Sequence, residues 1–173
     1  MKLILILLIF YINLYSNIKE DKLDYEIIEK KAKKGYSKYQ YEMYKIYRYG
    51  EYSKKIRKEK SFKWLKRSAS NNNIKSINKL ASIFFNASFY IKKADIYSSY
   101  YWYKRGCSLK DSYSCLKVST FYENGLLVGK DFNKFIYYVN LSIKYGSQDA
   151  IEFKHIILNK QQIKLEKKNL YIK

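Results

Sequence analysis

The sequence contains no proline and only 6 glycines among its 173 residues. Proline interrupts helices and glycine weakens them, so this scarcity favours long helical segments. Histidine occurs once and cysteine twice, too few to supply the four ligands of a structural zinc site. No glycine-rich phosphate loop and no G-x-S-x-G motif is present. We therefore expect no metal and no cofactor, and we assign no catalytic role to the single histidine, His155.

Acidic residues are also scarce. The chain has 35 Lys and Arg residues against 15 Asp and Glu residues, a formal net charge of +20. Such an excess is typical of proteins that bind nucleic acid, anionic membranes or acidic proteins. However, Lys, Asn, Ile and Tyr are all encoded by AT-rich codons, and biased composition explains the excess more simply. Arginine, which reads guanine edges, occurs only four times, which argues against a nucleic-acid partner. The most basic stretch, residues 54–66, is interpreted as a loop followed by a solvated helix face.

Residues 1–16 have the pattern of a secretory signal peptide. Met1 and Lys2 form a short basic start, residues 3–14 are almost entirely apolar, and Ser16 precedes a polar stretch. The apolar run is shorter than the about 20 residues of a membrane-spanning helix. We expect cleavage after Ser16, with retention of the segment as an anchor as the alternative. The mature chain is then exported, either to the periplasm or to the medium, with no membrane span.

Export determines how the two cysteines are interpreted. In an oxidising compartment an isolated pair usually forms a disulfide. We therefore predict a bond between Cys107 and Cys115.

Three sets of apolar residues recur every 36 to 38 positions, which indicates internal repeats. The first two sets lie four residues apart and therefore share one helix face. The third set follows the second after 16 to 18 residues, and this variation marks a loop between two helices. Each unit is thus predicted to be a helical hairpin. The sets are Met43, Leu80 and Val118; Tyr47, Phe84 and Tyr122; and Trp64, Trp102 and Tyr138.

Small residues occupy further fixed positions in these units. Ser61, Ser68 and Ala69 are expected to let neighbouring helices approach closely. Gly50 and Gly125 directly follow the first helix of their units, where a left-handed cap conformation suits glycine.

The motifs within these units resemble those of the Sel1-like repeat family. One segment looks like the A-x-x-G that opens such a repeat, and another matches the pattern Y-x-x-G followed by V-x-x-D-x-x-K. The resemblance covers roughly residues 32–158 and departs from the family at Tyr44, where the family prefers glycine. It implies an all-α fold, an α-solenoid of about three Sel1-like hairpins with a C-terminal capping helix. The matching residues are Ala32, Gly35, Tyr122, Gly125, Val128, Asp131 and Lys134.

This resemblance gives a division of the chain into four parts. Residues 1–16 are the signal peptide and residues 17–31 a polar, helical segment. Residues 32–158 form the repeat array, and residues 159–173 form a basic tail or capping helix.

The cysteine spacing is similar to that of the Helicobacter cysteine-rich proteins, a secreted branch of the Sel1-like family in which each repeat carries such a disulfide. The matching places in the other two units are apolar, Ala69 and Ile77 in one and Ile143 and Ile151 in the other. The chain thus keeps one of the branch's disulfides.

The same branch implies an enzymatic alternative, β-lactam binding or weak β-lactamase activity. Serine β-lactamases use an S-x-x-K motif. Composition alone accounts for the three occurrences in this chain, and neither S-D-N nor K-T-G accompanies them. The residues themselves therefore define no catalytic site. The occurrences begin at Ser16, Ser76 and Ser114.

Stacked helical hairpins form a superhelix whose concave face is lined by the first helix of each unit. Such a face commonly receives a peptide or protein, and we expect a partner of that kind. We expect the protein itself to be a monomer. The alternatives are that these side chains are merely solvated, or that the basic chain adheres to anionic surfaces. Positions two before and two after the aliphatic set give the groove candidates Tyr41, Lys45, Asn78, Ser82, Leu116 and Thr120.

Overall fold

The computed structural model describes residues 6, 11, 14, 22, 24–87, 90, 91, 93–127 and 129–170, without the side chains of residues 161 and 163–170. Most of the predicted signal peptide, residues 1–16, lies outside the described residues. Within the described part of the chain, every helix is too short or too polar to cross a bilayer.

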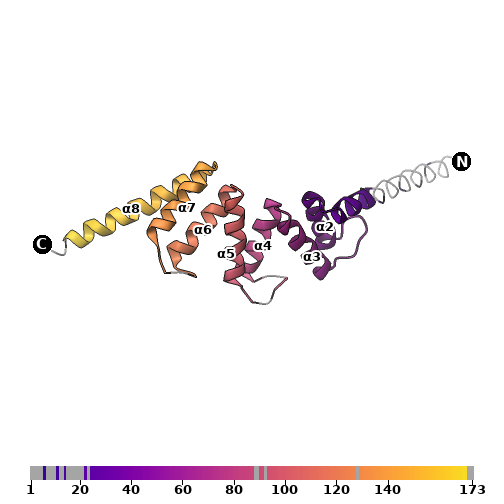
Figure 1. Ribbon diagram of the computed structural model, residues 1–173, viewed down its shortest axis with the longest axis horizontal. Helices are drawn as coiled ribbons and strands as arrows, with labels where there is room; N and C mark the ends of the chain where they lie inside the picture. The colour runs from indigo at the N-terminus through magenta and orange to yellow at the C-terminus, as the bar shows by residue number, and fades with distance from the viewer. Residues whose placement is uncertain are drawn as a thin grey trace. The chain divides into compact units, whose positions relative to one another are not determined.

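The regular elements of the described chain are α-helices (Figure 1). A helix over residues 24–33 precedes six helices of 13 residues each and one of 23 residues. This all-α architecture confirms the predicted fold class. The elements are α2 Ser37–Tyr49, α3 Lys58–Ser70, α4 Ile74–Asn86, α5 Ile96–Ser108, α6 Ser112–Asn124, α7 Phe132–Lys144 and α8 Gln148–Leu170.

The loops inside the hairpins differ in length but close on the same hydrogen bond. The residue before α3, Arg57, donates its backbone N–H to the carbonyl of Tyr47 at 2.9 Å. The equivalent bonds run from Asp95 to Phe84 at 2.7 Å and from Asp131 to Tyr122 at 3.1 Å. The length variation is therefore confined to the loop, as the sequence predicts. The turns between hairpins, residues 71–73, 109–111 and 145–147, are three residues long in each case.

The predicted glycine caps adopt the left-handed conformation, with φ of 79° at Gly50 and 68° at Gly125. Ala87 holds the equivalent position after α4 and also has positive φ, 44°. An L-residue with a Cβ pays about 1–2 kcal/mol for this conformation. The second hairpin thus keeps the left-handed backbone conformation of the repeat at this position, although Ala87 makes it less stable than glycine would.

The described chain divides into two compact units, residues 1–76 and 77–173. In the first unit Met43, Ile46 and Tyr47 of α2 form a core with Ala32, and the ring of Trp64 packs against it. All four core side chains are less than 9% exposed, because α2 turns one apolar face inward.

The second unit has a larger core built from α4 to α8. Val118 is fully buried, and the rings of Tyr122 and Tyr138 stack with centroids 5.5 Å apart. Phe135 contacts Phe153 of α8 edge to face, with centroids 5.7 Å apart. Val118, Tyr122 and Tyr138, which the sequence sets identified, thus belong to this core, and Trp102 packs against it. Helix α8 continues unbroken through the predicted boundary between residues 158 and 159.

Candidate functional site

Two of the six groove candidates, Tyr41 and Lys45, lie on α2 in the first unit and are half-buried. Burial raises the pKa of the Tyr41 phenol. The Lys45 ammonium pairs with the Glu42 carboxylate at 2.5 Å, and this hydrogen bond raises the pKa of Lys45. Lys45 is therefore a charged but already partnered group.

Ser82 of α4 and Thr120 of α6, also predicted from the sequence, line a cavity in the second unit. Its volume is about 170 Å³. Four of its lining residues are aromatic, and two of these, Tyr103 and Phe121, are almost completely buried. The cavity thus joins side chains from three consecutive helices. Its lining consists of Ser82, Phe85, Asn86, Tyr103, Tyr113, Lys117, Thr120 and Phe121.

The aromatic wall of the cavity is electrically neutral. The rings of Tyr103 and Tyr113 meet edge to face with centroids 6.2 Å apart. Burial, followed by the neighbouring Tyr113, raises the pKa of Tyr103, so its phenol stays protonated at physiological pH. The ammonium of Lys117 lies 5.2 Å from the centre of the Tyr113 ring and is the one charged group among the described lining residues.

The polar groups of the cavity are suited to binding rather than to catalysis. Asn86 contributes an amide whose Nδ2 is 3.5 Å from the Ser82 Oγ. Thr120 contributes a hydroxyl that donates to the Lys117 carbonyl at 2.8 Å. Among its described residues, the lining holds no carboxylate, imidazole or thiol that could act as a general base beside a nucleophile. The cavity can therefore hold an apolar ring, and its polar side chains can form hydrogen bonds to the groups next to that ring.

The remaining two candidates, Asn78 and Leu116, do not line this cavity. Asn78 donates through Nδ2 to the Asp111 carboxylate at 2.9 Å, and its Oδ1 accepts from the Ser114 hydroxyl at 2.6 Å. Leu116 packs against the core of the second unit. Asn78 therefore stabilises the start of α6, and Leu116 contributes to the core.

The serines of two S-x-x-K motifs are fully buried parts of helix caps. Ser114 donates its backbone N–H to the Asp111 carboxylate at 2.8 Å, and its hydroxyl is 2.7 Å from the same carboxylate. Ser76 occupies the same position in α4 and donates its hydroxyl to Ser68 at 2.6 Å. Neither hydroxyl is accessible to a substrate. Ser16, in the third motif, lies outside the described residues.

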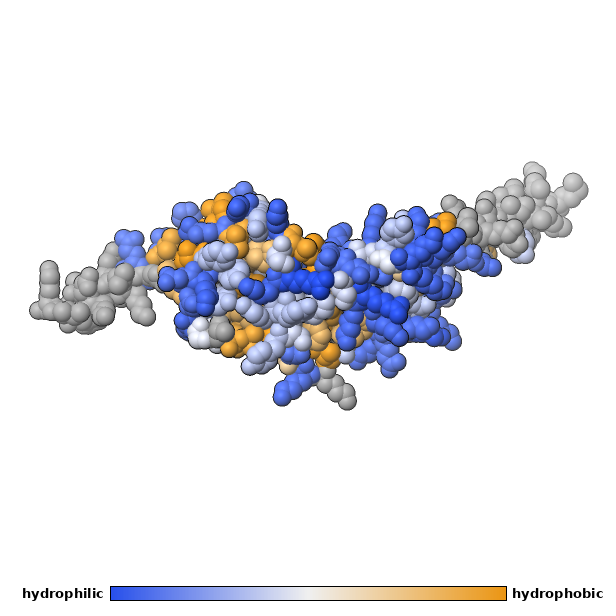
Figure 2. Space-filling model, in the orientation of Figure 1, coloured by the Kyte–Doolittle hydropathy of each residue, from blue (hydrophilic) through white to orange (hydrophobic). Residues whose placement is uncertain are grey.

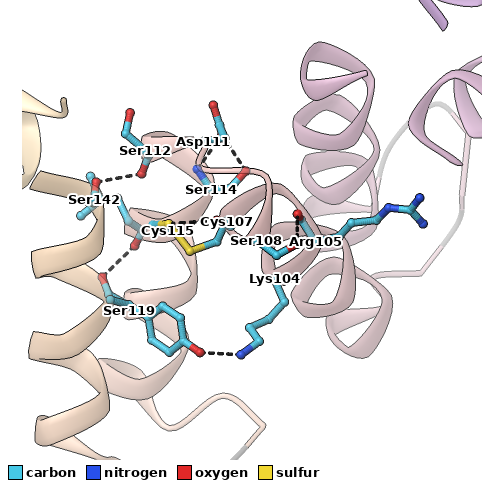
Figure 3. The surroundings of a disulfide bond; sticks show 12 residues. Lys104, Arg105, Cys107, Ser108, Asp111, Ser112, Ser114, Cys115, Ser119 and Ser142 are labelled. Atoms are coloured by element: carbon cyan, nitrogen blue, oxygen red, sulfur yellow. Dashed lines mark hydrogen bonds between the residues drawn. A yellow bond between two sulfur atoms is a disulfide. The ribbon is translucent and has the colours of Figure 1, made fainter. Parts of the chain in front are cut away.

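Cys107 and Cys115 are bonded, with an S–S distance of 2.06 Å and a Cα–Cα distance of 4.6 Å. The bond joins the last turn of α5 to the first turn of α6, as predicted from the sequence (Figure 3). Beside it the Ser142 hydroxyl donates to the carbonyl of Ser112 at 2.8 Å. The first unit has the equivalent bond, from Ser68 to the Ser37 carbonyl at 2.7 Å. In the first and third hairpins a small residue thus ties the second helix to the first helix of the same hairpin.

Sequence reasoning missed all four aromatic residues of the cavity, Phe85, Tyr103, Tyr113 and Phe121. Phe121 lies three positions after Val118 of the aliphatic set. Phe85 and Tyr113 lie five positions from the aliphatic set, one helical turn beyond the positions considered. Tyr103 belongs to a second helix, α5, from which no groove residue was expected. Among the described residues, no three His, Cys, Asp or Glu side chains come together as a metal site would require.

Solved structures share this arrangement of hairpins. A Sel1 repeat protein from Oxalobacter formigenes is 19% identical with a TM-score of 0.68, over 75% of this chain and 95% of that one. Helicobacter pylori cysteine-rich protein B is 20% identical with a TM-score of 0.55, over 79% of this chain and 96% of that one. A protective antigen of uropathogenic Escherichia coli with an SLR fold is 19% identical with a TM-score of 0.62, over 72% of this chain and 26% of that one.

These similarities confirm that the chain has the Sel1-like repeat fold, an α-solenoid of helical hairpins. No protein-family model matches the sequence, and no curated protein matches it.

Proposed function

We propose that this protein is an exported Sel1-like repeat module that binds a peptide segment of a partner protein. The binding site is the cavity between α4, α5 and α6. The observation that carries the proposal is that side chains from three consecutive helices enclose one aromatic-walled cavity with a polar rim. Repeat proteins of this architecture use such surfaces for binding.

The size of the cavity indicates what it holds. Pockets for small-molecule substrates usually measure about 300–1,000 Å³. A cavity of about 150 Å³ lined by apolar side chains accommodates one benzene ring. The cavity here, about 170 Å³, fits one large apolar or aromatic side chain better than a whole metabolite.

The rim of the cavity suits the backbone of such a peptide. Asn86 offers an amide that can donate to a peptide carbonyl and accept from a peptide N–H. The Lys117 ammonium favours an acidic side chain or a terminal carboxylate next to the anchoring residue. The preferred ligand is therefore a peptide with an apolar anchor followed by an acidic group.

Export is supported by the pattern of residues 1–16 and by the disulfide, which persists in oxidising compartments. The alternative function, β-lactam binding or weak hydrolysis, rests on resemblance to the cysteine-rich branch. The burial of Ser76 and Ser114 speaks against a serine nucleophile.

Selection from a phage-displayed library of random peptides, with oxidised mature protein as the bait, tests the binding proposal. We expect enrichment of peptides that share one large apolar residue. Thr120→Trp, which fills the cavity, should weaken the enriched peptide's affinity tenfold or more.

Asn133→Trp is the matched control, because Asn133 is exposed on α7 and outside the cavity lining. Its affinity should equal that of the parent protein. A library without enrichment, or equal binding by the Thr120→Trp and Asn133→Trp variants, would refute the proposed site.

A further inference from the structure

Helix α3 carries more positive charge than the matching helices of the other hairpins. It has five Lys and Arg residues and one acid, whereas α5 and α7 have two cations each and no acid. The excess on α3 therefore distinguishes the first hairpin from the other two.

Four cations of α3 have exposed side chains and form no ion pair with any described carboxylate. Lys60, Lys63, Lys66 and Arg67 are all exposed, and no acidic side chain pairs with them within the described part of the chain. In α7 the equivalent of Lys60 is Lys134, which pairs with Asp131 at 3.1 Å. The first hairpin lacks that partner and keeps its charges available.

Three of these cations each lie over an aromatic ring. The ammonium of Lys60 is 5.3 Å from the centre of the Tyr47 ring, and that of Lys66 is 4.6 Å from the Phe62 ring. The Arg67 guanidinium is 4.9 Å from the Trp64 ring. Cation–π contacts hold a charge in position without cancelling it. The cations are thereby oriented while their outward sides stay free to meet an anion.

Arg57 extends the charge beyond the start of α3. Its equivalents, Asp95 and Asp131, cap α5 and α7 through their carboxylates. Arg57 forms no side-chain cap, and a cation at this end opposes the helix dipole. The first hairpin therefore carries a positive charge where the other two carry a stabilising acid.

These cations follow the axis of the helix. Lys60, Lys63 and Arg67 are three and four residues apart and share one face. The rise of about 1.5 Å per residue spaces them about 4.5–6 Å apart along the axis. A row of this kind matches a linear chain of anions better than a single ion. Figure 2 shows hydrophilic side chains dominating the surface over α2 and α3.

We propose that the exposed face of α3, formed by Arg57, Lys60, Lys63, Lys66 and Arg67, binds an acidic polysaccharide. Clusters of Lys and Arg are typical of patches that bind heparin or nucleic acid. Phe62 and Trp64 are already covered by cations, so the face offers no open ring for stacking nucleic-acid bases. No exposed large apolar side chain belongs to α3 itself, and the single exposed Ile56 beside Arg57 is too little apolar surface to anchor the face in a bilayer.

Affinity for immobilised heparin, measured with the full mature chain at about 150 mM salt, tests the proposal. The triple variant Lys60→Gln, Lys63→Gln, Lys66→Gln should bind about tenfold more weakly or worse, because three anion contacts are lost. The matched control, Lys79→Gln, Lys130→Gln, Lys144→Gln, removes the same charge from exposed lysines of the second unit. The control should stay within about twofold of the parent affinity, since long-range charge is screened beyond about 8 Å at this salt.

Equal weakening of both triple variants would overturn the proposal, because net charge alone would then explain binding. Tighter α3-dependent binding to duplex DNA or phosphatidylglycerol vesicles than to heparin would overturn the choice of ligand. The absence of any binding to heparin at this salt concentration would also overturn it. Thr120→Trp should leave heparin affinity unchanged, which separates this site from the proposed peptide site.

Discussion

Gly106 of α5 approaches Ser114 of α6 so closely that a Cβ on Gly106 would lie 2.1 Å from the Ser114 Oγ and 2.7 Å from its Cβ. The same position in the other hairpins pairs Ser68 with Ser76 and Ser142 with Ala150. Ser68 and Ser76 have room for a hydrogen bond of 2.6 Å. In the second hairpin the disulfide lies next to this contact, and the position in α5 is held by the smallest residue, Gly106.

Gly106→Ala should therefore destabilise the protein although alanine is the better helix former. Overpacking costs about 1–3 kcal/mol, and the disulfide limits how far α5 and α6 can separate. Chemical denaturation should show a net loss of up to about 2 kcal/mol, because the helix-propensity gain of about 1 kcal/mol offsets part of the overpacking cost. Gly129→Ala is the control, because a Cβ there meets nothing within 4 Å. Equal stability of the two variants would contradict the close approach.

The disulfide should stabilise the mature chain. It links residues 8 positions apart, and closing a loop of about nine residues contributes about 2–3 kcal/mol by loop entropy. The double variant Cys107→Ala, Cys115→Ala should unfold at correspondingly lower denaturant concentration. Dithiothreitol should lower the stability of the parent but not that of the variant. A parent protein unaffected by reduction would contradict the prediction.

The sequence predicted the repeats well because helical periodicity and loop slack are local properties. Met43, Leu80 and Val118 were found by their spacing, and each is fully buried. The groove was harder to predict, because it depends on how each helix is rotated against its neighbours. Asn78 donates a hydrogen bond to Asp111, 33 residues further along the chain. The i, i+4 spacing within one helix does not predict such a contact.

Ser114 should have a structural rather than a catalytic role. Ser114→Ala removes a buried hydroxyl that lies between Asn78 and Asp111, which should cost about 1–2 kcal/mol in unfolding free energy. Purified mature protein should not hydrolyse a chromogenic β-lactam, before or after this substitution. Turnover by the parent protein that disappears in a folded Ser114→Ala variant would restore the enzymatic alternative.

Acid should weaken the caps of α5 and α7. Hydrogen bonds from the Ser98 hydroxyl and then its backbone N–H lower the pKa of Asp95, and the Lys134 backbone N–H lowers that of Asp131. A carboxyl with a depressed folded-state pKa stabilises the fold above its unfolded pKa, about 3.9. That contribution is lost as the pH falls through the folded pKa.

Thermal unfolding at about pH 7 and about pH 3, on either side of the unfolded pKa, measures this effect. The double variant Asp95→Asn, Asp131→Asn keeps a capping side chain without a titrating group. Its unfolding temperature should fall less between the two pH values than that of the parent. Identical falls would show that other groups cause the acid sensitivity.

Arg57→Asp should stabilise the protein while weakening its affinity for acidic polysaccharide. The backbone at Arg57, with φ −136° and ψ 96°, nearly matches that of the capping residue Asp131, with φ −134° and ψ 98°. An aspartate there can thus cap α3, which should add about 0.5–1 kcal/mol to the unfolding free energy.

Arg57→Ala separates the two effects, because it removes the positive charge without supplying a cap. Both variants should bind heparin more weakly than the parent, but only Arg57→Asp should unfold at higher denaturant concentration. An Arg57→Asp variant that is more stable and binds heparin as tightly as the parent would show that Arg57 does not belong to the proposed binding face of α3. Higher stability together with lower heparin affinity of Arg57→Asp would instead indicate that the first hairpin has a positive charge beside α3 in place of a helix cap.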